Sequence, residues 1–156
     1  MTLFLMAFLT GFSLPQTEDW VVIASHQEAA IGVDRTSVRR SGGTVSATVL
    51  MGMFVPETPP GTSAPLQYYL SEETVDCAAV TRVEHAVRIY SPEGVLLGTT
   101  SPDPEPGIRS GSMYGSLHQA LCDVESGLAG DGHATPLIAI QAEAAERRAT
   151  GRAVND

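Results

Sequence analysis

The amino-acid sequence predicts an α+β fold, with a twisted antiparallel sheet of about five to six strands, one packed helix and a C-terminal helical tail. Three observations lead to this prediction. From Trp20 onwards, apolar and polar residues alternate with a period of two, which is typical of strands. Turns rich in glycine or proline separate the alternating stretches. Helical patterns are confined to the part of the chain after residue 111.

The first strands have the clearest patterns. Residues 20–24 predict a short strand that is apolar on both faces, and residues 31–38 follow it after a polar turn. The sequence Ser41-Gly42-Gly43 indicates a hairpin, because paired glycines accept the positive φ angles of tight turns. The next strand places every second residue on one apolar face, namely Val45, Ala47, Val49, Met51 and Met53.

Proline-rich segments divide the rest of the sheet region. Residues 54–66 contain four prolines and a glycine, so they predict an exposed loop. Three further strands are expected, at 68–77, 82–90 and 95–97. A second proline-rich loop at 101–107 cannot join the interior of a sheet, because proline lacks the N–H that the ladder needs.

Two helices are predicted after the last strand. Ser112 is expected to cap a short helix that ends at Cys122 and carries an apolar stripe of Leu117, Ala120 and Leu121.

A second helix is expected to begin at Thr135-Pro136, after three spaced glycines. Its apolar face is thin and mostly alanine, so it either docks loosely or stays exposed. Ordering the linker would offset most of what docking contributes, so this tail is expected to be dispensable for folding. The expected division is therefore a domain at 19–122 and a flexible linker with a helical tail at 123–156.

Composition excludes several classes of function. The chain has 156 residues, of which 43% are hydrophobic, enough to bury a core. Its 18 acidic residues outnumber nine arginines, there is no lysine, and the net charge is −9. This charge repels phosphate backbones, so nucleic acid is not an expected partner. No phosphate-binding loop, dinucleotide-binding turn, HExxH helix or CxxC pair occurs, and no cofactor is expected.

The N-terminal segment predicts export. Leu3–Leu9 is an uncharged apolar run, far shorter than the ~20 residues that cross a bilayer, so no transmembrane span is expected. Its length fits a signal peptide at 1–13, with small residues near Ser13 for cleavage, although no basic residue precedes it. The alternative is a hydrophobic first strand packed in the core. The expected location is the periplasm or the cell surface.

The two cysteines, Cys77 and Cys122, agree with export. An even number of cysteines in a small exported domain favours a disulfide bond, whereas two separate buried thiols would be ordinary in a cytosolic protein.

Several short motifs, in order, resemble the surface-adhesin protein E family of small exported bacterial domains. They are Trp20-Val21-Val22-Ile23, the stretch 33–38 followed by Arg-Ser-Gly-Gly, Val75-Asp76-Cys77, an arginine-bearing strand ending at Tyr90, and a helix closing on Cys122. The resemblance covers Asp19 to Cys122. It implies an antiparallel sheet carrying a helix, a Cys77–Cys122 disulfide, and a place on the cell surface or in the periplasm. Members of the family bind host matrix proteins, but the match lies in scaffold residues, so that activity is not transferred.

Residues that could carry catalysis or bind metal are scattered. His26, His85, His118 and His133 lack the spacing of metal ligands, and alternation predicts His85 to be a hydrogen-bonded core histidine. No GxSxG elbow accompanies Ser112 or Ser116, and the acidic run from Glu72 to Asp76 is typical of a solvated edge. No catalytic, cofactor or metal residues are assigned, and an enzyme is not expected.

The exposed features favour binding. Arg39, Arg40, Arg82 and Arg88 are candidates for a guanidinium patch suited to carboxylates or sulfated chains. The favoured alternative is cross-strand pairing of these arginines with Glu84 and Asp34. Tyr68 and Tyr69, together with Tyr90, are candidates for an aromatic contact surface, and at least one of the three is expected to lie in the core.

The leading hypothesis is a non-enzymatic exported binding module, adhesin-like in type, with an unidentified protein or glycan partner. The alternative is a structural or accessory component of the bacterial cell envelope that docks through its C-terminal helix. A hydrolase is a remote third.

Overall fold

The computed structural model describes residues 17–59, 62–102, 108–123 and 128–152. The expected signal segment at 1–13 and most of the proline-rich loop at 101–107 lie outside the described residues. In the part that is described, no helix combines the length and the apolar character needed to cross a membrane.

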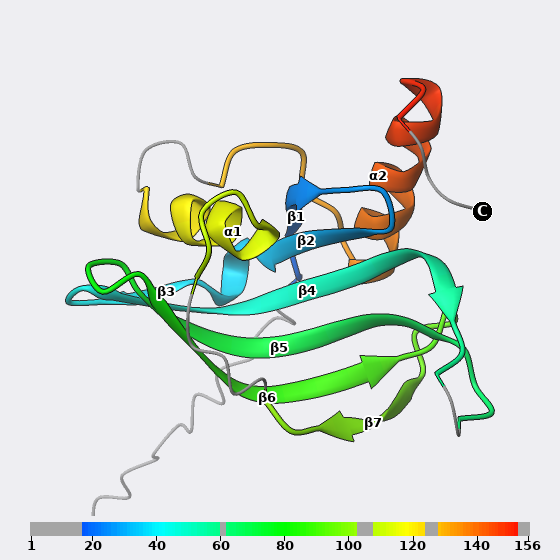
Figure 1. Ribbon diagram of the computed structural model, residues 1–156, viewed down its shortest axis with the longest axis horizontal. Helices are drawn as coiled ribbons and strands as arrows, with labels where there is room; N and C mark the ends of the chain where they lie inside the picture. Colours follow the sequence, from blue (N-terminus) through cyan, green and yellow to red (C-terminus); the bar gives the residue numbers. More distant parts are fainter. Residues whose placement is uncertain (1–16, 60–61, 103–107, 124–127, 153–156) are drawn as a thin grey trace, which may run out of the picture.

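The described chain forms one antiparallel sheet of seven strands with two α helices, which confirms the α+β class with one or two more strands than expected (Figure 1). The order along the sheet is β1-β2-β4-β5-β6-β7, and short β3 pairs with β4. The strands are β1 (Trp20–Ser25), β2 (Ala29–Asp34), β3 (Arg39–Ser41), β4 (Thr44–Glu57), β5 (Leu66–Asp76), β6 (Thr81–Tyr90) and β7 (Leu96–Thr100). A 3-10 turn η1 (Arg35–Ser37) follows β2, and the helices are α1 (Met113–Cys122) and α2 (Pro136–Ala149).

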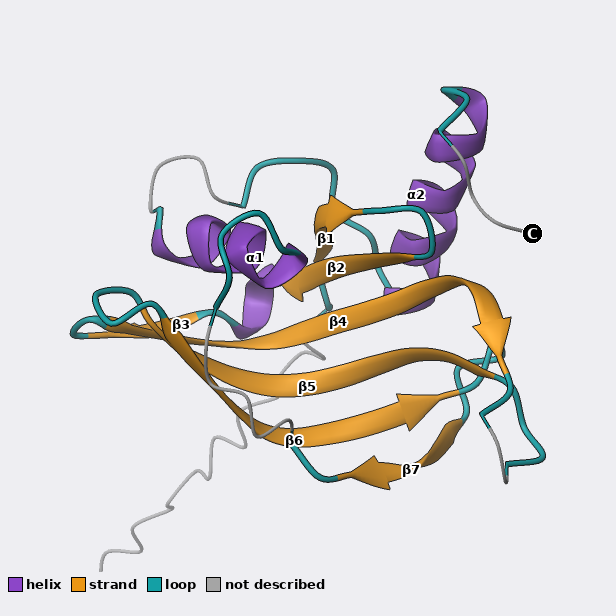
Figure 2. Cartoon of the chain, viewed as in Figure 1, coloured by secondary structure: helices purple, strands orange, loops and turns teal. Residues whose placement is uncertain are grey.

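The two helices cover opposite faces of the sheet. Neighbouring residues of a strand point to opposite faces, so Val49 and Leu50 of β4 mark the two sides. Val49 packs in a cluster with Leu117 and Leu121 of α1. Leu50 packs in a second cluster with Ile140 of α2. The sheet is therefore the middle layer of three, and Figure 2 shows the helices gathered near β1, β2 and β4, away from β7.

Helix α1 has the predicted limits and the predicted cap. The Ser112 hydroxyl accepts a hydrogen bond from the Gly115 N–H at 3.1 Å, and the helix ends at Cys122. Cys122 forms a disulfide bond with Cys77, which immediately follows β5. The bond that the resemblance implied is confirmed, and it joins the end of a central strand to the end of α1.

Helix α2 docks, which resolves a question that the sequence left open. Thr135 caps it and Pro136 occupies its first turn, as predicted. Ile140 is only 1% exposed, and a Cβ atom at Gly52 would collide with its side chain. The contact therefore depends on glycine in β4. The expected division at residue 122 is not tested by this contact, but the burial of Ile140 favours a tail that contributes to the stability of the fold.

The prediction that His85 lies in the core is wrong. A register shift between β5 and β6 pairs Glu72 with Ala86 but Glu73 with Glu84, which leaves His85 as an extra residue. Such a bulge reverses which residues face the core on either side of it. As a result Arg82 and Val87 are both buried, whereas His85 is exposed and hydrogen-bonded to the Thr74 hydroxyl at 3.0 Å.

The first proline-rich loop is shorter than expected. Strand β4 runs through Pro56 to Glu57, and Glu57 pairs with Leu66 at the start of β5. Proline is tolerated here because the register is already interrupted between Gly52 and Glu57. The loop that remains lies at the same end of the sheet as the start of β7 (Figure 1).

Candidate binding site

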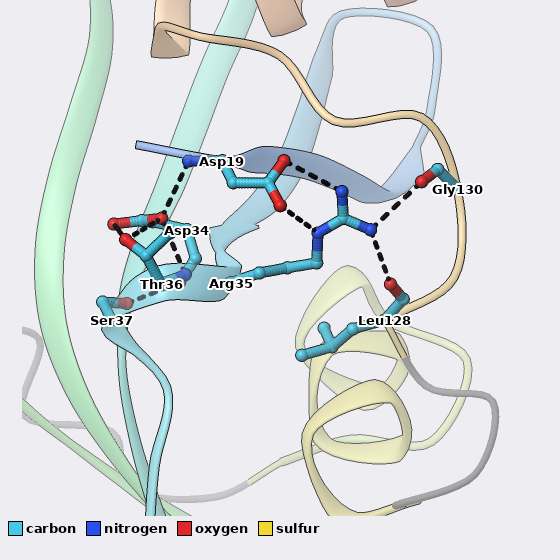
Figure 3. Close-up of polar contacts among 7 residues, drawn as sticks. All are labelled: Asp19, Asp34, Arg35, Thr36, Ser37, Leu128 and Gly130. Carbon is cyan, nitrogen blue, oxygen red and sulfur yellow. Dashed lines mark hydrogen bonds and ion pairs between the residues drawn. The ribbon is translucent and has the colours of Figure 1, made fainter. Parts of the chain in front are cut away.

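Within the motif at residues 33–38, Asp34–Ser37 form a polar cluster with Asp19, Leu128 and Gly130, which lie in two other segments of the chain (Figure 3). The Arg35 guanidinium donates from Nε and Nη2 to the two carboxylate oxygens of Asp19, each at 2.8 Å. Its Nη1 donates to the carbonyls of Leu128 and Gly130, at 3.2 and 3.1 Å. Two hydrogen bonds in parallel fix the guanidinium plane. The cluster thus holds the segment before α2 against β1, and its role is structural.

Replacing Asp19 with asparagine is expected to reduce the loss of stability that the protein shows when the pH is lowered toward 3. The hydrogen bond from Arg35 lowers the pKa of Asp19 below its ordinary value of 3.8, despite an opposing effect of desolvation. The carboxylate therefore stabilises the fold above about pH 3.8, and this contribution is lost as the pH falls through the lower pKa of the folded state. Thermal unfolding from pH 7 to pH 3 should show Asp19→Asn less stable at pH 7, with the difference shrinking in acid.

The exposed ion pair of Glu72 with Arg88, at 3.6 Å, offers a control. Glu72→Gln should change stability little, because exposed pairs are screened by water. A deficit of Asp19→Asn that stays constant down to pH 3 would contradict the assignment.

The structure distributes the six predicted binding residues over several environments. Arg39 and Arg40 are exposed on β3. The Arg39 Nη1 donates to the carbonyls of Thr36 and Val38, which holds it beside its own strand. Arg88 is partly exposed on β6 and pairs across the strands with Glu72, which is not one of the partners that the sequence suggested.

Two of the six, Arg82 and Tyr68, are buried, and they cannot present an exposed surface. Arg82 is only 4% exposed because the β6 bulge turns it under α1, where its guanidinium carbon lies 3.8 Å from the centre of the Tyr114 ring. Its Nη1 lies 3.7 Å from Glu73 and 3.8 Å from Glu84. Tyr68 stacks on Tyr90 with ring centres 4.8 Å apart.

Arg39 and Arg40 do not form one patch with Tyr69. Arg39 and Arg40 lie opposite Ser46 and Val45, whereas Tyr69 lies opposite Met51. At about 3.3 Å per residue, these positions are roughly 15–20 Å apart along the sheet.

Tyr69 instead belongs to a groove that the sequence did not predict. The groove has a volume of about 660 Å³ and is formed by β5, β6, β7 and the loop after β4. The β-ladder brings Tyr69, Ile89 and Gly98 into line, so these residues share one face. The groove is lined by Pro59, Thr62, Ser63, Ala64, Leu66, Tyr69, Ile89, Leu97, Gly98, Thr99 and Thr100.

The chemistry of this groove is neutral. None of its lining residues carries a charge, although the chain as a whole carries −9. Burial, and secondarily the negative charge of Glu57, raise the pKa of Tyr69, so its phenol stays neutral and can donate a hydrogen bond. Apolar side chains and hydroxyl groups can therefore contact a ligand here without desolvating an ion.

Gly98 leaves room on this face of the sheet. A Cβ atom at Gly98 would meet no other atom within 4 Å, so the fold does not require glycine at this position. The sequence signal that could have indicated the groove is the uncharged segment Leu96–Thr100, which is an unusual composition for an edge strand.

The groups considered for catalysis do not assemble. Glu72 and Glu73 are neighbours on β5 and therefore point to opposite faces, where they meet Arg88 and Arg82 respectively. The Ser112 hydroxyl caps α1. Within the described residues, no group of three or more histidine, cysteine, aspartate or glutamate side chains is placed to hold a metal ion.

Comparison with known proteins identifies the scaffold. The model of the surface-adhesin protein E family matches residues 20–123, which is two thirds of the chain. No curated protein and no solved structure gives a significant match. The match includes all seven strands, helix α1 and the disulfide. The chain therefore belongs to the surface-adhesin protein E family.

Proposed function

We propose that this protein is an exported, non-enzymatic binding module that captures a protein or glycan partner through the neutral groove beside β7. The observation that carries this proposal is the groove itself, which combines Tyr69, Ile89 and Leu97 with hydroxyl groups and no charge. Such a surface is typical of recognition sites, where apolar area gives affinity and a few polar groups give orientation.

Export is part of the proposal. Membership of the family supports a place at the cell surface or in the periplasm, and the Cys77–Cys122 bond is typical of an oxidising compartment.

An accessory role in the envelope, with α2 as the docking element, has less support. Ala139 and Ile140 of α2 are buried against its own sheet, so they are not available to a partner. A free α2 would first have to leave the cluster that includes Trp20 and Leu50.

Gly98→Val is expected to reduce partner binding by at least roughly tenfold, because the added side chain projects into the groove. Gly43→Val is the matched control, since a Cβ atom at Gly43 also meets no atom within 4 Å but lies in the hairpin before β4. Binding of both variants and the native chain to immobilised matrix proteins and to a glycan array would be measured, with melting temperatures recorded in parallel.

Both variants should keep the native melting temperature, and only Gly98→Val should lose binding. If the folded native chain binds none of these partners, or if Gly98→Val binds as well as Gly43→Val does, the proposed function is wrong.

A further inference from the structure

We propose that the groove accepts an extended peptide segment of a partner protein, which adds to the sheet as a further strand beside β7. This inference rests on the proposed function, because it concerns the same site. Its starting point is the way in which β7 contributes to the groove. Leu97, Gly98, Thr99 and Thr100 all line it.

Consecutive residues of a strand point to alternate faces, so a cavity above one face contacts only every second side chain. Four consecutive lining residues mean that backbone atoms of β7, and not only its side chains, border the groove. The register shift between Ile89 and Tyr90, which leaves Leu97 out of the ladder, contributes to this arrangement. A ligand in the groove therefore meets the backbone of β7 as well as its side chains.

The two edges of the sheet differ. At the β1 edge, the N–H of Trp20 donates to the carbonyl of His133 and the N–H of His133 donates to the carbonyl of Trp20, both at 2.8 Å. The chain's own backbone thus occupies part of that edge. Among the residues that the structure describes, no strand pairs with the outer side of β7.

Edge strands present N–H and C=O groups that can pair with another chain, and charged residues or proline normally prevent this. Strand β7 contains neither. Val95, Leu96 and Leu97 are instead 58%, 52% and 40% exposed. Backbone pairing with apolar contacts is the chemistry by which a sheet edge recognises an extended peptide.

The groove also specifies the side chains of the peptide. Its apolar contacts come from Leu66, Ile89 and Leu97, and its hydroxyl groups from Tyr69, Thr99 and Thr100. A segment of uncharged residues that alternates apolar with small polar side chains fits both. A glycan fits less well, because the groove offers a single aromatic ring and no charged or amide side chain.

The test uses the full chain and a capped peptide of about eight residues, alternating valine and threonine, at concentrations where the peptide is monomeric. Two further peptides carry N-methyl groups on alternate amides, one on the odd positions and one on the even positions. In a strand, alternate amides point toward the same neighbour, so only one of these sets faces β7. Binding would be measured by titration calorimetry, and amide hydrogen exchange of β7 would be followed.

The unmodified peptide should bind and slow amide exchange in Leu96–Thr100. One methylated set should bind at least roughly tenfold more weakly and the other should bind like the parent. Gly98→Val should weaken binding, and Gly43→Val should not.

Equal binding of both methylated peptides would overturn strand addition. Strand addition would also be overturned if the chain bound no peptide but bound a glycan or a folded protein, with Gly98→Val weakening that binding. The second result would leave the proposed function intact. Dimerisation of the chain through β7, seen by sedimentation and abolished by Gly98→Val, would also overturn the proposal, because the strand added to β7 would then come from a second copy of this chain. If no partner of any kind binds, the proposed function fails as well.

Discussion

Replacing both Cys77 and Cys122 with serine is expected to lower the free energy of unfolding by about 4 kcal/mol. The bond closes a loop between residues 45 positions apart in the sequence. Without it, the unfolded chain gains the conformations that the loop excludes. The folded chain must then hold α1 on the sheet through the apolar contacts of the cluster that contains Leu117 and Leu121. The melting temperature should fall by on the order of 10 °C.

Reduction provides the control for this prediction. Dithiothreitol should lower the melting temperature of the native chain to that of the double serine variant, and it should have no effect on the variant itself. A variant that melts with the oxidised native chain would show that α1 is held by packing alone. Loss of the cooperative transition would show instead that the bond is required for folding.

The strands and caps could be predicted because they depend on local sequence. Alternation in β4 marks Val45, Ala47 and Val49 as one buried face, and all three belong to one cluster. The N-caps Ser112 and Thr135 were predictable for a similar reason, since each hydroxyl satisfies an N–H of its own helix.

The faces of β6 could not be predicted, because they depend on the strand that pairs with it. The extra residue at His85 exists only relative to Glu72 and Glu73 of β5. Without that register, alternation from Val87 back to residue 83 predicts a buried Val83, which is in fact 53% exposed.

The candidate site was harder still. Its walls come from a loop near residue 62, from Tyr69, from Ile89 and from β7, and only the ladder brings these segments together. The arginines and tyrosines stand out in the sequence by residue type. Exposure, however, depends on the tertiary position, and it separates Arg82 and Tyr68 from the others. A segment without charge, such as Leu96–Thr100, becomes informative only once it is known to form an edge.

Ile140→Ala is expected to lower the free energy of unfolding by about 2–5 kcal/mol, because it leaves a cavity in a packed cluster. Ile138→Ala is the matched control in the same helix. Its side chain is 46% exposed, so the same substitution should cost no more than about 0.5 kcal/mol. Both values can be obtained from urea unfolding at neutral pH.

Deletion of residues 124–156 should have a larger effect than Ile140→Ala. It removes Ile140 and Ala139 from their cluster, so it exposes Trp20 and Leu50 to water. It also removes the carbonyls of Leu128 and Gly130 that accept hydrogen bonds from Arg35. The truncated chain is expected to melt more than roughly 10 °C below the native one or to aggregate. A truncated chain that melts within a few degrees of the native protein would instead support a self-sufficient domain at 19–122. In that case the ordering of the segment before α2 must cost as much free energy as the burial of Ile140 contributes.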